Sequence, residues 1–245
     1  MIEIKNLKKA FGQKKITRCL DLTVEDKEFI AIIGRSGEGK SVLLKQIIGL
    51  IKPDSGSVLI DGEDITKLKG KELKKVFQKC GYVFQFAALL DSLTVFENVG
   101  ITMLEDGVEP KKVRPKVLDR IKSVGLGADT LEKFPSELSG GMKKRVGLAR
   151  TLMLSPKILI YDEPTTGLDP ITVRRIHELI KKTHEEQQAT TLVISHDIEI
   201  FNYADTVGML HEGKIVYKGP AKDIWESKNK YIHQFIRGLA KGPIQ

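Results

Sequence analysis

Residues 34–41 carry the most specific chemical signal in the chain. They read Gly-Arg-Ser-Gly-Glu-Gly-Lys-Ser and match the pattern GxxxxGK[ST], which is typical of a loop that binds phosphates. Glycines let such a loop wrap closely around phosphates, and successive backbone N–H groups at a helix N-terminus favour an anion. Lys40 is then expected to reach the β and γ phosphates of a nucleotide, and the Ser41 hydroxyl to bind Mg²⁺. An apolar run precedes the loop and a helical pattern follows it, so chance is a poor explanation.

Two carboxylates follow a second apolar run. Residues 158–161 are Ile-Leu-Ile-Tyr, and Asp162 and Glu163 come directly after them. The first carboxylate is placed to hold Mg²⁺ through its water shell, and the second to polarise an attacking water. By itself, an apolar strand that ends in acids is most often only a strand leaving the core. In company with Lys40 and Ser41, however, the pair predicts nucleotide hydrolysis, with Asp162 and Ser41 at the metal.

A third motif lies between these two. Residues 138–142, Leu-Ser-Gly-Gly-Met, are similar to the LSGGQ signature of ABC ATPases, with Met142 where that family usually has Gln. Ser139, Gly140 and Gly141 come before a helix that we expect from Met142 onward, so they form a second helix N-terminus suited to an anion. The resemblance implies that this second site serves the ATP of a partner subunit in a head-to-tail dimer. Because the anion contacts come from Ser139 and backbone groups, we expect activity to survive the change at Met142.

The resemblance covers nearly the whole chain and implies further site residues. Phe11 looks like the aromatic residue that stacks on adenine, and Gln85 like the glutamine that contacts both nucleotide and Mg²⁺. His196 looks like the switch histidine, which acts in catalysis together with Glu163 and Lys40. Taken singly, Phe11 is more often a core residue, and Gln85 and His196 are surface residues in most sequences. Their order around the strong motifs favours the functional interpretation. The expected nucleotide contacts are Phe11, Gly34, Arg35, Ser36, Gly37, Glu38, Gly39, Lys40, Ser41, Val42, Gln85, Ser139, Gly140 and Gly141.

Longer stretches at residues 138–150, 161–170 and 235–243 resemble one branch of the family, the Mla (MCE-associated) ATPases. That branch energises movement of phospholipids between the membranes of Gram-negative bacteria. The resemblance implies ATP and Mg²⁺ as cofactors and a second copy of this chain as a partner. It also implies an integral membrane permease of the MlaE type that handles the lipid, with MCE-domain and small accessory subunits. The chain is then expected in the cytoplasm, peripheral on the cytoplasmic face of the inner membrane.

The motifs need a parallel sheet to bring them together. Apolar runs that read as buried strands lie at residues 29–33, 157–162 and 190–195. Helical patterns lie at residues 41–50, 113–124, 142–154 and 170–186. Asp169 is placed to cap the last of these helices, with Pro170 at its first position. The alternation of strand and helix predicts a parallel sheet. Short strands and turns before residue 29, and again around residues 57–62, predict hairpin-like β structure beside it.

These elements and the family resemblance together give an α/β fold: a P-loop NTPase (RecA-like) core with an antiparallel β subdomain and an inserted helical subdomain. We expect the core and β subdomain at residues 1–85 and 156–225, the helical subdomain at 86–155 and a C-terminal tail at 226–245. In the tail, apolar residues recur at helical spacing from Tyr231 to Leu239, with Gly238 or Gly242 and Pro243 as the end. This apolar face either covers the chain's own core or reaches a neighbouring subunit. On the second alternative, deleting residues 228–245 weakens the dimer or permease assembly and leaves the monomer folded.

Bulk properties exclude several other classes. The chain has 245 residues, of which 41% are hydrophobic and 29% charged, as in a folded soluble domain. Apolar runs are too short to span a membrane, and no secretory signal or disulfide spacing is present. The net charge of +8 comes from dispersed residues without interleaved aromatic side chains, which disfavours nucleic acid as a partner. An ABC protein acting on DNA or ribosomes usually has two ATPase domains or a long coiled coil. A protein that uses nucleotide binding as a structural switch, without hydrolysis, would be expected to lack Glu163 or His196, and both are present.

Overall fold

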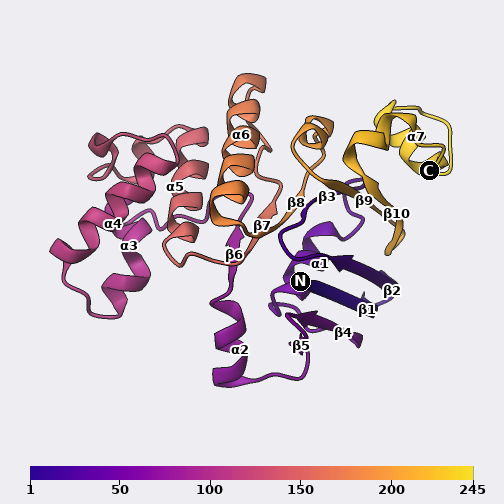
Figure 1. Cartoon of the computed structure of the whole chain (residues 1–245), viewed down its shortest axis with the longest axis horizontal. Helices are drawn as coiled ribbons and strands as arrows, with labels where there is room; N and C mark the ends of the chain where they lie inside the picture. Colours follow the sequence, from indigo (N-terminus) through magenta and orange to yellow (C-terminus); the bar gives the residue numbers. More distant parts are fainter. Residues whose placement is uncertain (245) are drawn as a thin grey trace.

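Two β-sheets organise residues 1–244, the part of the chain that the computed structural model describes (Figure 1). The larger sheet has six strands in the order β10-β9-β3-β8-β7-β6. Its strands are β3 (Phe29–Ile33), β6 (Cys80–Val83), β7 (Ile158–Asp162), β8 (Thr190–Ile194), β9 (Thr206–His211) and β10 (Lys214–Pro220). All neighbours are parallel except β10, which runs antiparallel to β9. The predicted parallel sheet is therefore confirmed.

The strands β3, β7 and β8 are buried at every residue, as their continuous apolar sequences require of a sheet covered on both faces. Their register brings the carboxyl ends together, because Ile32 in β3 and Asp162 in β7 both lie opposite Ile194 in β8. The chain leaves these strands into the segments that carry Lys40, Glu163 and His196. One edge of the sheet thus gathers three of the predicted motifs.

The smaller sheet is antiparallel, with the order β2-β1-β4-β5. Its strands are β1 (Ile2–Phe11), β2 (Lys14–Val24), β4 (Ser55–Ile60) and β5 (Glu63–Asp64). The prediction of short strands before residue 29 was wrong in length, since β1 and β2 have 10 and 11 residues. Bulges at three points along their pairing break the regular alternation of buried and exposed residues, and that alternation is the signal from which a long strand is read.

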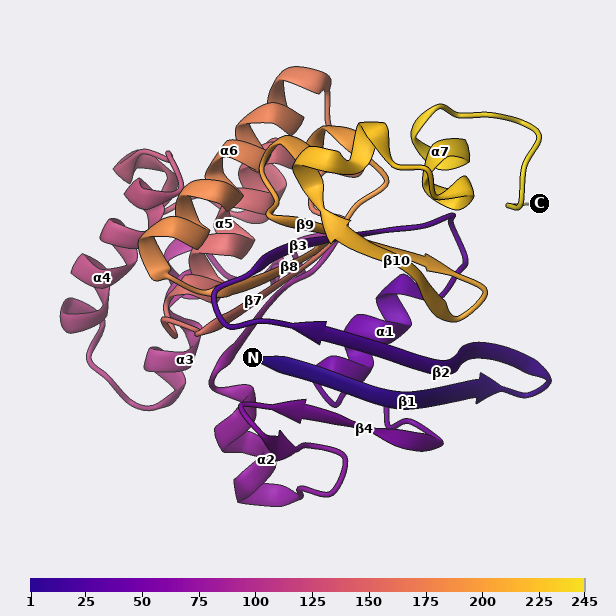
Figure 2. The same cartoon turned by 45° about the vertical axis from the view of Figure 1, so that its right-hand side comes forward.

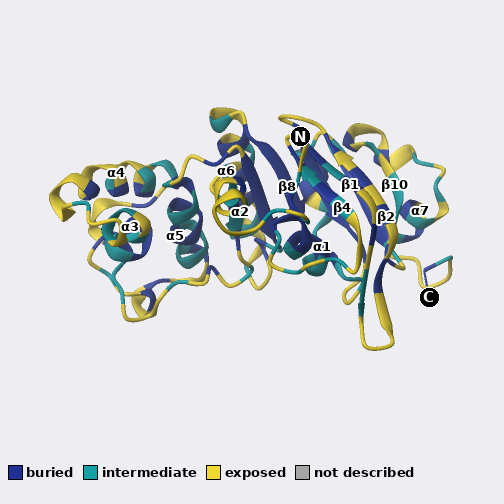
Figure 3. Cartoon of the chain, turned by 90° about the horizontal axis from the view of Figure 1, so that it is seen from below, coloured by how far each residue is buried: buried dark blue, intermediate teal, exposed yellow. Residues whose placement is uncertain are grey.

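Helix α1 (Lys40–Ile47) lies between the two sheets (Figure 2). Its apolar side chains Leu43, Leu44 and Ile47 are fully buried in a core shared with the inner faces of both sheets. Figure 3 shows the same arrangement by burial, with the buried residues along the strands and around α1. The short helix α2 (Gly70–Phe77) and strand β6 were not predicted. The phosphate-loop helix is thereby held on two sides.

The remaining helices cover the other face and one end of the larger sheet (Figure 1). They are α3 (Val95–Glu105), α4 (Pro110–Ser123), α5 (Gly140–Leu152), α6 (Pro170–Gln187) and α7 (Lys230–Ile236). The side chain of Asp169 accepts a hydrogen bond from the backbone N–H of Thr172 at 3.0 Å, so the predicted cap of α6 is confirmed. Helix α5 begins at Gly140 rather than at Met142, because Ser139 is its N-cap. None of the helices within residues 1–244 has the length and apolar composition that crossing a membrane requires.

Helix α7 and the segment after it pack on their own chain. Ile232, Ile236 and Ile244 are buried in the core that lies between the larger sheet and the helices covering it. The Gln234 side chain fixes the last turn, because its amide donates to the backbone oxygen of Ile244 at 2.9 Å and accepts from its N–H at 2.7 Å. Gly238, with φ of 60°, follows the end of the helix, as predicted. Of the two alternatives for the tail, the structure shows the packing on the chain's own core.

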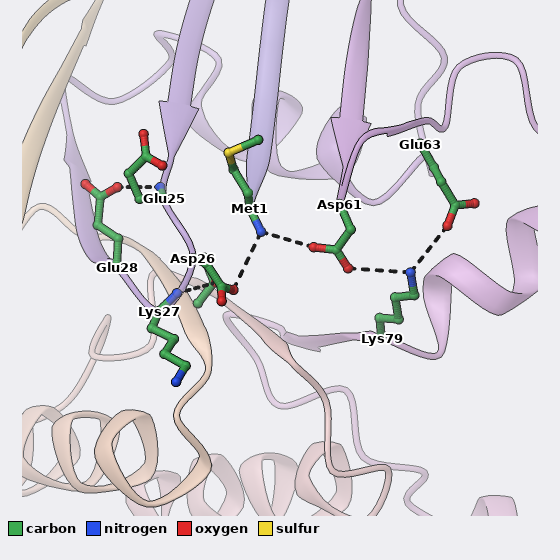
Figure 4. A network of polar contacts seen from close by, with 9 residues as sticks. Met1, Glu25, Asp26, Lys27, Glu28, Asp61, Glu63 and Lys79 are labelled. Carbon is green, nitrogen blue, oxygen red and sulfur yellow. Dashed lines mark hydrogen bonds and ion pairs between the residues drawn. The ribbon is translucent and has the colours of Figure 1, made fainter.

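A polar network joins the start of β1 to the residues that follow β2 and β4 and precede β6 (Figure 4). The amino group of Met1 contacts Asp61 at 3.1 Å and Asp26 at 3.7 Å. Asp61 also pairs with Lys79, which in turn contacts Glu63 at 3.4 Å. These groups are partly exposed, so each pair contributes little stability by itself. The network nevertheless links the smaller sheet to the segment that enters β6.

Candidate functional site

Residues 34–39 form a loop between β3 and α1, and Lys40 lies beneath it. The Lys40 amine donates hydrogen bonds to the backbone oxygens of Gly34 and Arg35, both at 2.8 Å. Burial lowers the pKa of Lys40, while the carboxylates of Glu163, Glu38 and Asp162 act in the opposite direction. Arg35, Ser36 and Gly37 are exposed on the loop, and Ser41 and Val42 continue into the helix. An ammonium beneath an exposed glycine-rich loop that leads into a helix N-terminus is a setting that suits phosphates.

Gly39 shows why this loop is rich in glycine. Its φ of 93° lies in the left-handed region, and a side chain there would collide with Cγ2 of Ile16 in β2. The smaller sheet therefore lies directly against the loop. Ile16 was not predicted as part of the site. The alternation of apolar and polar residues in a strand shows which side chains are buried, but not which residues they contact.

Ser41 and Asp162, the two residues predicted at the metal, are in contact. The Ser41 hydroxyl donates to one carboxylate oxygen of Asp162 at 2.8 Å, and the hydroxyl of Tyr82 donates to the other at 2.8 Å. Burial, together with the negative charge of Asp162, raises the pKa of Tyr82. The tyrosine therefore remains a hydrogen-bond donor that orients the Asp162 carboxylate.

The carboxylate of Glu163 lies among three donors. His196 contacts one oxygen at 2.6 Å, and Gln85 and Thr166 donate to the other at 3.2 and 3.1 Å. Glu163 itself has a left-handed backbone, with φ of 48°, and its N–H donates to the oxygen of Ile194 at the end of β8. The carboxylate is thereby held at the same edge of the sheet as Lys40.

The structure does not bring every predicted residue to this cluster. Gln85 contacts Glu163 but forms no hydrogen bond with Ser41 or Asp162 among the described residues. Ser139 caps α5, where its hydroxyl accepts from the N–H of Met142 at 3.3 Å, and Gly140 and Gly141 begin that helix. Helix α5 packs against β6, and Gly140 and Gly141 face Leu168 and Thr172 rather than residues 34–41. The signature residues are therefore separate from the chain's own phosphate loop.

A hollow of about 520 Å³ opens beside the loop. It is lined by Gln13, Lys14, Lys15, Ile16, Arg18, Arg35, Ser36, Gly37, Glu38, Glu212 and Gly213. Phe11 lies at the end of β1, before this segment, with half of its surface exposed. The basic side chains suit an anionic ligand, and an exposed aromatic ring suits a base.

Sequence reasoning missed several residues that shape the cluster. Tyr82 and Thr166 hold the two carboxylates, and Lys144 donates to the backbone oxygen of Thr166 at 2.8 Å. Burial lowers the pKa of Lys144 to about 8, while the charge of Glu163 acts in the opposite direction. Glu38 receives hydrogen bonds from His211 and from the N–H of Glu212, which fixes the loop against β9. Tyr82, Thr166 and Lys144 had no signal in the sequence, and strand β6, which carries Tyr82, was itself not predicted.

The residues present fit ATP and Mg²⁺. Lys40 and the exposed loop N–H groups suit the phosphates, and the touching oxygens of Ser41 and Asp162 form the hard oxygen set that Mg²⁺ prefers. The hollow beside the loop accommodates the rest of a nucleotide. Glu163 and His196 lie next to these groups without being part of the oxygen set.

Comparison with known proteins gives a consistent result. The family profile described as ABC transporter matches residues 17–166. The probable ribonucleotide transport ATP-binding protein mkl of Mycobacterium leprae is 39% identical over 245 residues, 99% of this chain and 70% of that protein. The intermembrane phospholipid transport system ATP-binding protein MlaF of Haemophilus influenzae is 38% identical over 248 residues, 100% of this chain and 93% of that protein.

A solved structure agrees with the fold. The ATP-binding cassette MJ0796, as a dimer in a post-hydrolysis state bound to ADP and Pi, superposes with a TM-score of 0.83 at 32% sequence identity. The match covers 90% of this chain and 99% of that one. These findings confirm the predicted P-loop NTPase fold, the cofactors ATP and Mg²⁺, and the hydrolysis of ATP. The chain belongs to the ABC transporter family of ATP-binding proteins.

Proposed function

We propose that this chain powers a membrane transporter that moves phospholipids between the two membranes of a Gram-negative bacterium. The observation that supports an energy-coupling role is the meeting of Lys40, Asp162, Glu163 and His196 at one edge of the sheet. The lipid substrate is supported by the similarity to MlaF, which extends over nearly the full length of both proteins. The name of mkl points instead to ribonucleotide transport. Identification of the substrate held by the purified complex distinguishes the two.

Each residue of the cluster has a role that follows from its contacts. Lys40 neutralises charge on the β and γ phosphates, with Phe11 against the base. Ser41 and Asp162, whose oxygens touch, would hold Mg²⁺, with Gln85 nearby through its hydrogen bond to Glu163, and the ion would neutralise charge on the phosphates. Glu163 orients the attacking water and takes its proton, while His196 steadies the Glu163 carboxylate and the charge on the transferred phosphoryl group.

The signature at Ser139, Gly140 and Gly141 serves the nucleotide of a second copy of this chain. It offers the N-terminus of a 13-residue helix that is capped by Ser139 and whose first glycines face Leu168 and Thr172. One chain therefore holds two half-sites that complement each other in a head-to-tail pair. Closure of the pair on ATP, and opening after hydrolysis, is the motion passed to the permease.

The permease contact lies at the segment that follows Gln85. Phe84, Phe86 and Leu90 expose 38%, 83% and 47% of their surfaces there, which is unusual for side chains so apolar. The segment leads into α3–α5, the helical subdomain that we assign to residues 86–155, with core and β subdomain at 1–85 and 156–225. An integral membrane permease of the MlaE type, with MCE-domain and small accessory subunits, would hold the chain at the cytoplasmic face of the inner membrane.

Mixing two inactive variants tests the shared site. Ser139→Arg blocks the signature and Lys40→Ala removes the phosphate contact, so neither homodimer has a complete site. A mixed dimer keeps one site intact, formed by Lys40 of the first variant and Ser139 of the second. Measurable ATP hydrolysis in the mixture is expected. A mixture that stays inactive, although both variants fold and dimerise, would show that the sites are not shared.

Purification of the chain with its native membrane complex tests the substrate. We expect a multi-span membrane protein to copurify, and mass spectrometry of the extracted complex to find phospholipid held through detergent washing. A complex that instead retains and transports ribonucleotides would overturn the lipid assignment while leaving the ATPase assignment intact. The Phe86→Ser variant should lose the membrane protein and keep basal ATP hydrolysis.

A further inference from the structure

His177, in the middle of α6, is buried without a hydrogen-bond partner. Its side chain is 0% exposed, and neither ring nitrogen has a partner among the described residues. A buried polar atom left without a partner destabilises the folded state, so its presence calls for an explanation. Tyr203 packs beside the ring, with centroids 5.5 Å apart, and does not satisfy either nitrogen. The imidazole plays no part in the ATPase site described above.

Two carboxylates lie opposite this imidazole. One oxygen from each of Asp197 and Glu199 and one ring nitrogen of His177 all lie within 4.8 Å of one another. Asp197 is held in place, because its Oδ1 accepts from the N–H of Glu199 at 2.9 Å and its own N–H donates to Ser195. Its second oxygen has no hydrogen bond among the described residues. Glu199 is exposed, so its side chain can turn toward the imidazole without disturbing the core.

These three groups match the ligands of a transition-metal ion. A tetrahedral Zn²⁺ site has metal–ligand distances of about 2.0–2.2 Å to nitrogen and oxygen, so its ligands lie roughly 3.4 Å apart. The three ligand atoms lie within 4.8 Å of one another, at most about 1.4 Å wider than that spacing, and the exposed Glu199 side chain has room to rotate inward. Two carboxylates balance the charge of a divalent ion. An imidazole ligand disfavours Mg²⁺, which takes oxygen ligands in octahedral geometry.

The protonation state of His177 also suits a metal ligand. Burial lowers the pKa of His177, against the opposing effect of the Asp197 and Glu199 carboxylates. The imidazole is therefore neutral near pH 7, with a lone pair on one nitrogen. A hollow lined by Glu199, Tyr203, Arg174, Arg175 and Glu178 opens beside the cluster and gives an ion access from solvent. Arg174 in that hollow is paired with Glu178 at 3.2 Å.

We propose that His177, Asp197 and Glu199 bind one divalent transition-metal ion, with an open fourth position that faces the hollow. The ion ties α6 to the short 3₁₀ helix Ile198–Asn202. Asp197 directly follows His196, so the tie lies next to the segment that contacts Glu163. The site is distinct from the Mg²⁺ position at Ser41 and Asp162, and its existence does not depend on which substrate the transporter carries.

Zn²⁺ titration of the full chain tests the site. The chain is kept with excess Mg²⁺ and ADP so that the phosphate loop is filled, and Zn²⁺ affinity is measured by competition with a coloured indicator. We expect one tight equivalent for the wild type. The double variant Asp197→Asn, Glu199→Gln keeps the size of both side chains and should bind at least about tenfold more weakly. His177→Gln should have the same effect. If His177→Gln does not fold, the Zn²⁺ affinity of the double variant alone tests the proposal.

Two matched variants locate the ion. His196→Gln removes the neighbouring histidine, and Glu185→Gln with Glu186→Gln removes two acids from the same helix; both should keep the tight equivalent. Zn²⁺ should also raise the melting temperature of the wild type and of these controls, but not of the Asp197, Glu199 double variant. The proposal is overturned if the double variant binds as tightly as the wild type, or if binding disappears only when His196 is replaced.

Discussion

Glu163 and Asp162 are neighbours in the chain, yet their carboxylates have separate surroundings. Asp162 receives two hydroxyl groups, from Ser41 and Tyr82, whereas Glu163 contacts His196, Gln85 and Thr166. Successive residues of a strand point to opposite faces, and the left-handed backbone at Glu163 then turns the second carboxylate away from the strand direction. In the proposed mechanism, this separation gives Asp162 to the metal and Glu163 to the water.

Replacing Glu163 by Gln should leave ATP binding intact and reduce hydrolysis by two or more orders of magnitude. A positioned general base typically contributes 10² to 10⁴ in rate, and the amide keeps the shape of the side chain. Steady-state phosphate release and fluorescent nucleotide binding measure the two effects. The contrasting variant Lys40→Ala should weaken nucleotide binding itself. Near-normal hydrolysis by Glu163→Gln would remove the residue from its catalytic role.

Lys144 gives a pH dependence with a definite sign. Burial lowers its pKa from an ordinary value of 10.5 to about 8, so the folded state disfavours its charged form. That cost is present in full below pH 8 and disappears as the pH rises from 8 toward 10.5. The free energy of unfolding of the wild type should therefore rise relative to Lys144→Met across this interval. Denaturant titrations between pH 7 and 10 measure the difference, and a constant difference would contradict the burial of the amine.

The order of the site residues along the sequence predicted most of the cluster, but not its contacts. Lys40, Ser41, Asp162, Glu163 and His196 carry recognisable patterns, and the parallel sheet brings them together. Tyr82 and Thr166 carry no pattern of their own, because their roles depend on where β6 and the segment after β7 lie in space. Hydrogen bonds between residues 80 positions apart follow from tertiary packing, which local sequence does not encode.

At the scale of elements, helix α3 shows how a local signal fixes a boundary. Thr94 accepts a hydrogen bond from the N–H of Glu97 at 3.2 Å, and the Glu97 carboxylate accepts from the N–H of Thr94 at 2.8 Å. These reciprocal bonds form a capping box, and they lower the pKa of Glu97. The helix that follows the exposed Phe84–Leu90 stretch therefore has a defined start.

Thr94→Ala should lower the free energy of unfolding by about 1 kcal/mol, because the N–H of Glu97 loses the hydroxyl that accepts its hydrogen bond, although the Glu97 carboxylate keeps its bond to the backbone of residue 94. Thr102→Ala is the matched control, since Thr102 is exposed within the same helix and caps nothing. Urea unfolding followed by circular dichroism measures both variants. Equal losses for the two substitutions would mean that the capping box does not stabilise the helix.

Elements with long apolar runs were predictable, whereas α2, α3, β6, β9 and β10 were not predicted. Strands β3, β7 and β8 are continuous apolar segments, and the cap and proline at the start of α6 marked that helix. Helix α2 buries only Val76 and is rich in lysine, so its pattern resembles that of a solvated loop. Strand β6 has four residues and contains Gly81, which weakens strand propensity. Both elements are held by packing against neighbours more than by their own preference.

At the scale of the whole molecule, the tail closes the fold. Deleting residues 228–245 should lower the melting temperature of the isolated chain, because the deletion removes the buried Ile232, Ile236 and Ile244. Differential scanning fluorimetry with and without ATP measures the shift. The variant Leu239→Ser is the control, since that side chain is 44% exposed and its loss should leave the melting temperature nearly unchanged. A truncated chain that melts like the wild type would make the tail dispensable for the core.

The exposed aromatic side chains near Gln85 have a consequence for the colloidal behaviour of the isolated chain. Phe86, 83% exposed, promotes sticking between molecules, whereas the net charge of +8 keeps them apart. Salt screens the repulsion over a Debye length of about 10 Å at 0.1 M and leaves the apolar attraction intact. Light scattering by the purified chain should therefore rise with ionic strength, and Phe86→Ser should flatten that rise. A preparation of the purified chain held at low salt should therefore stay dispersed.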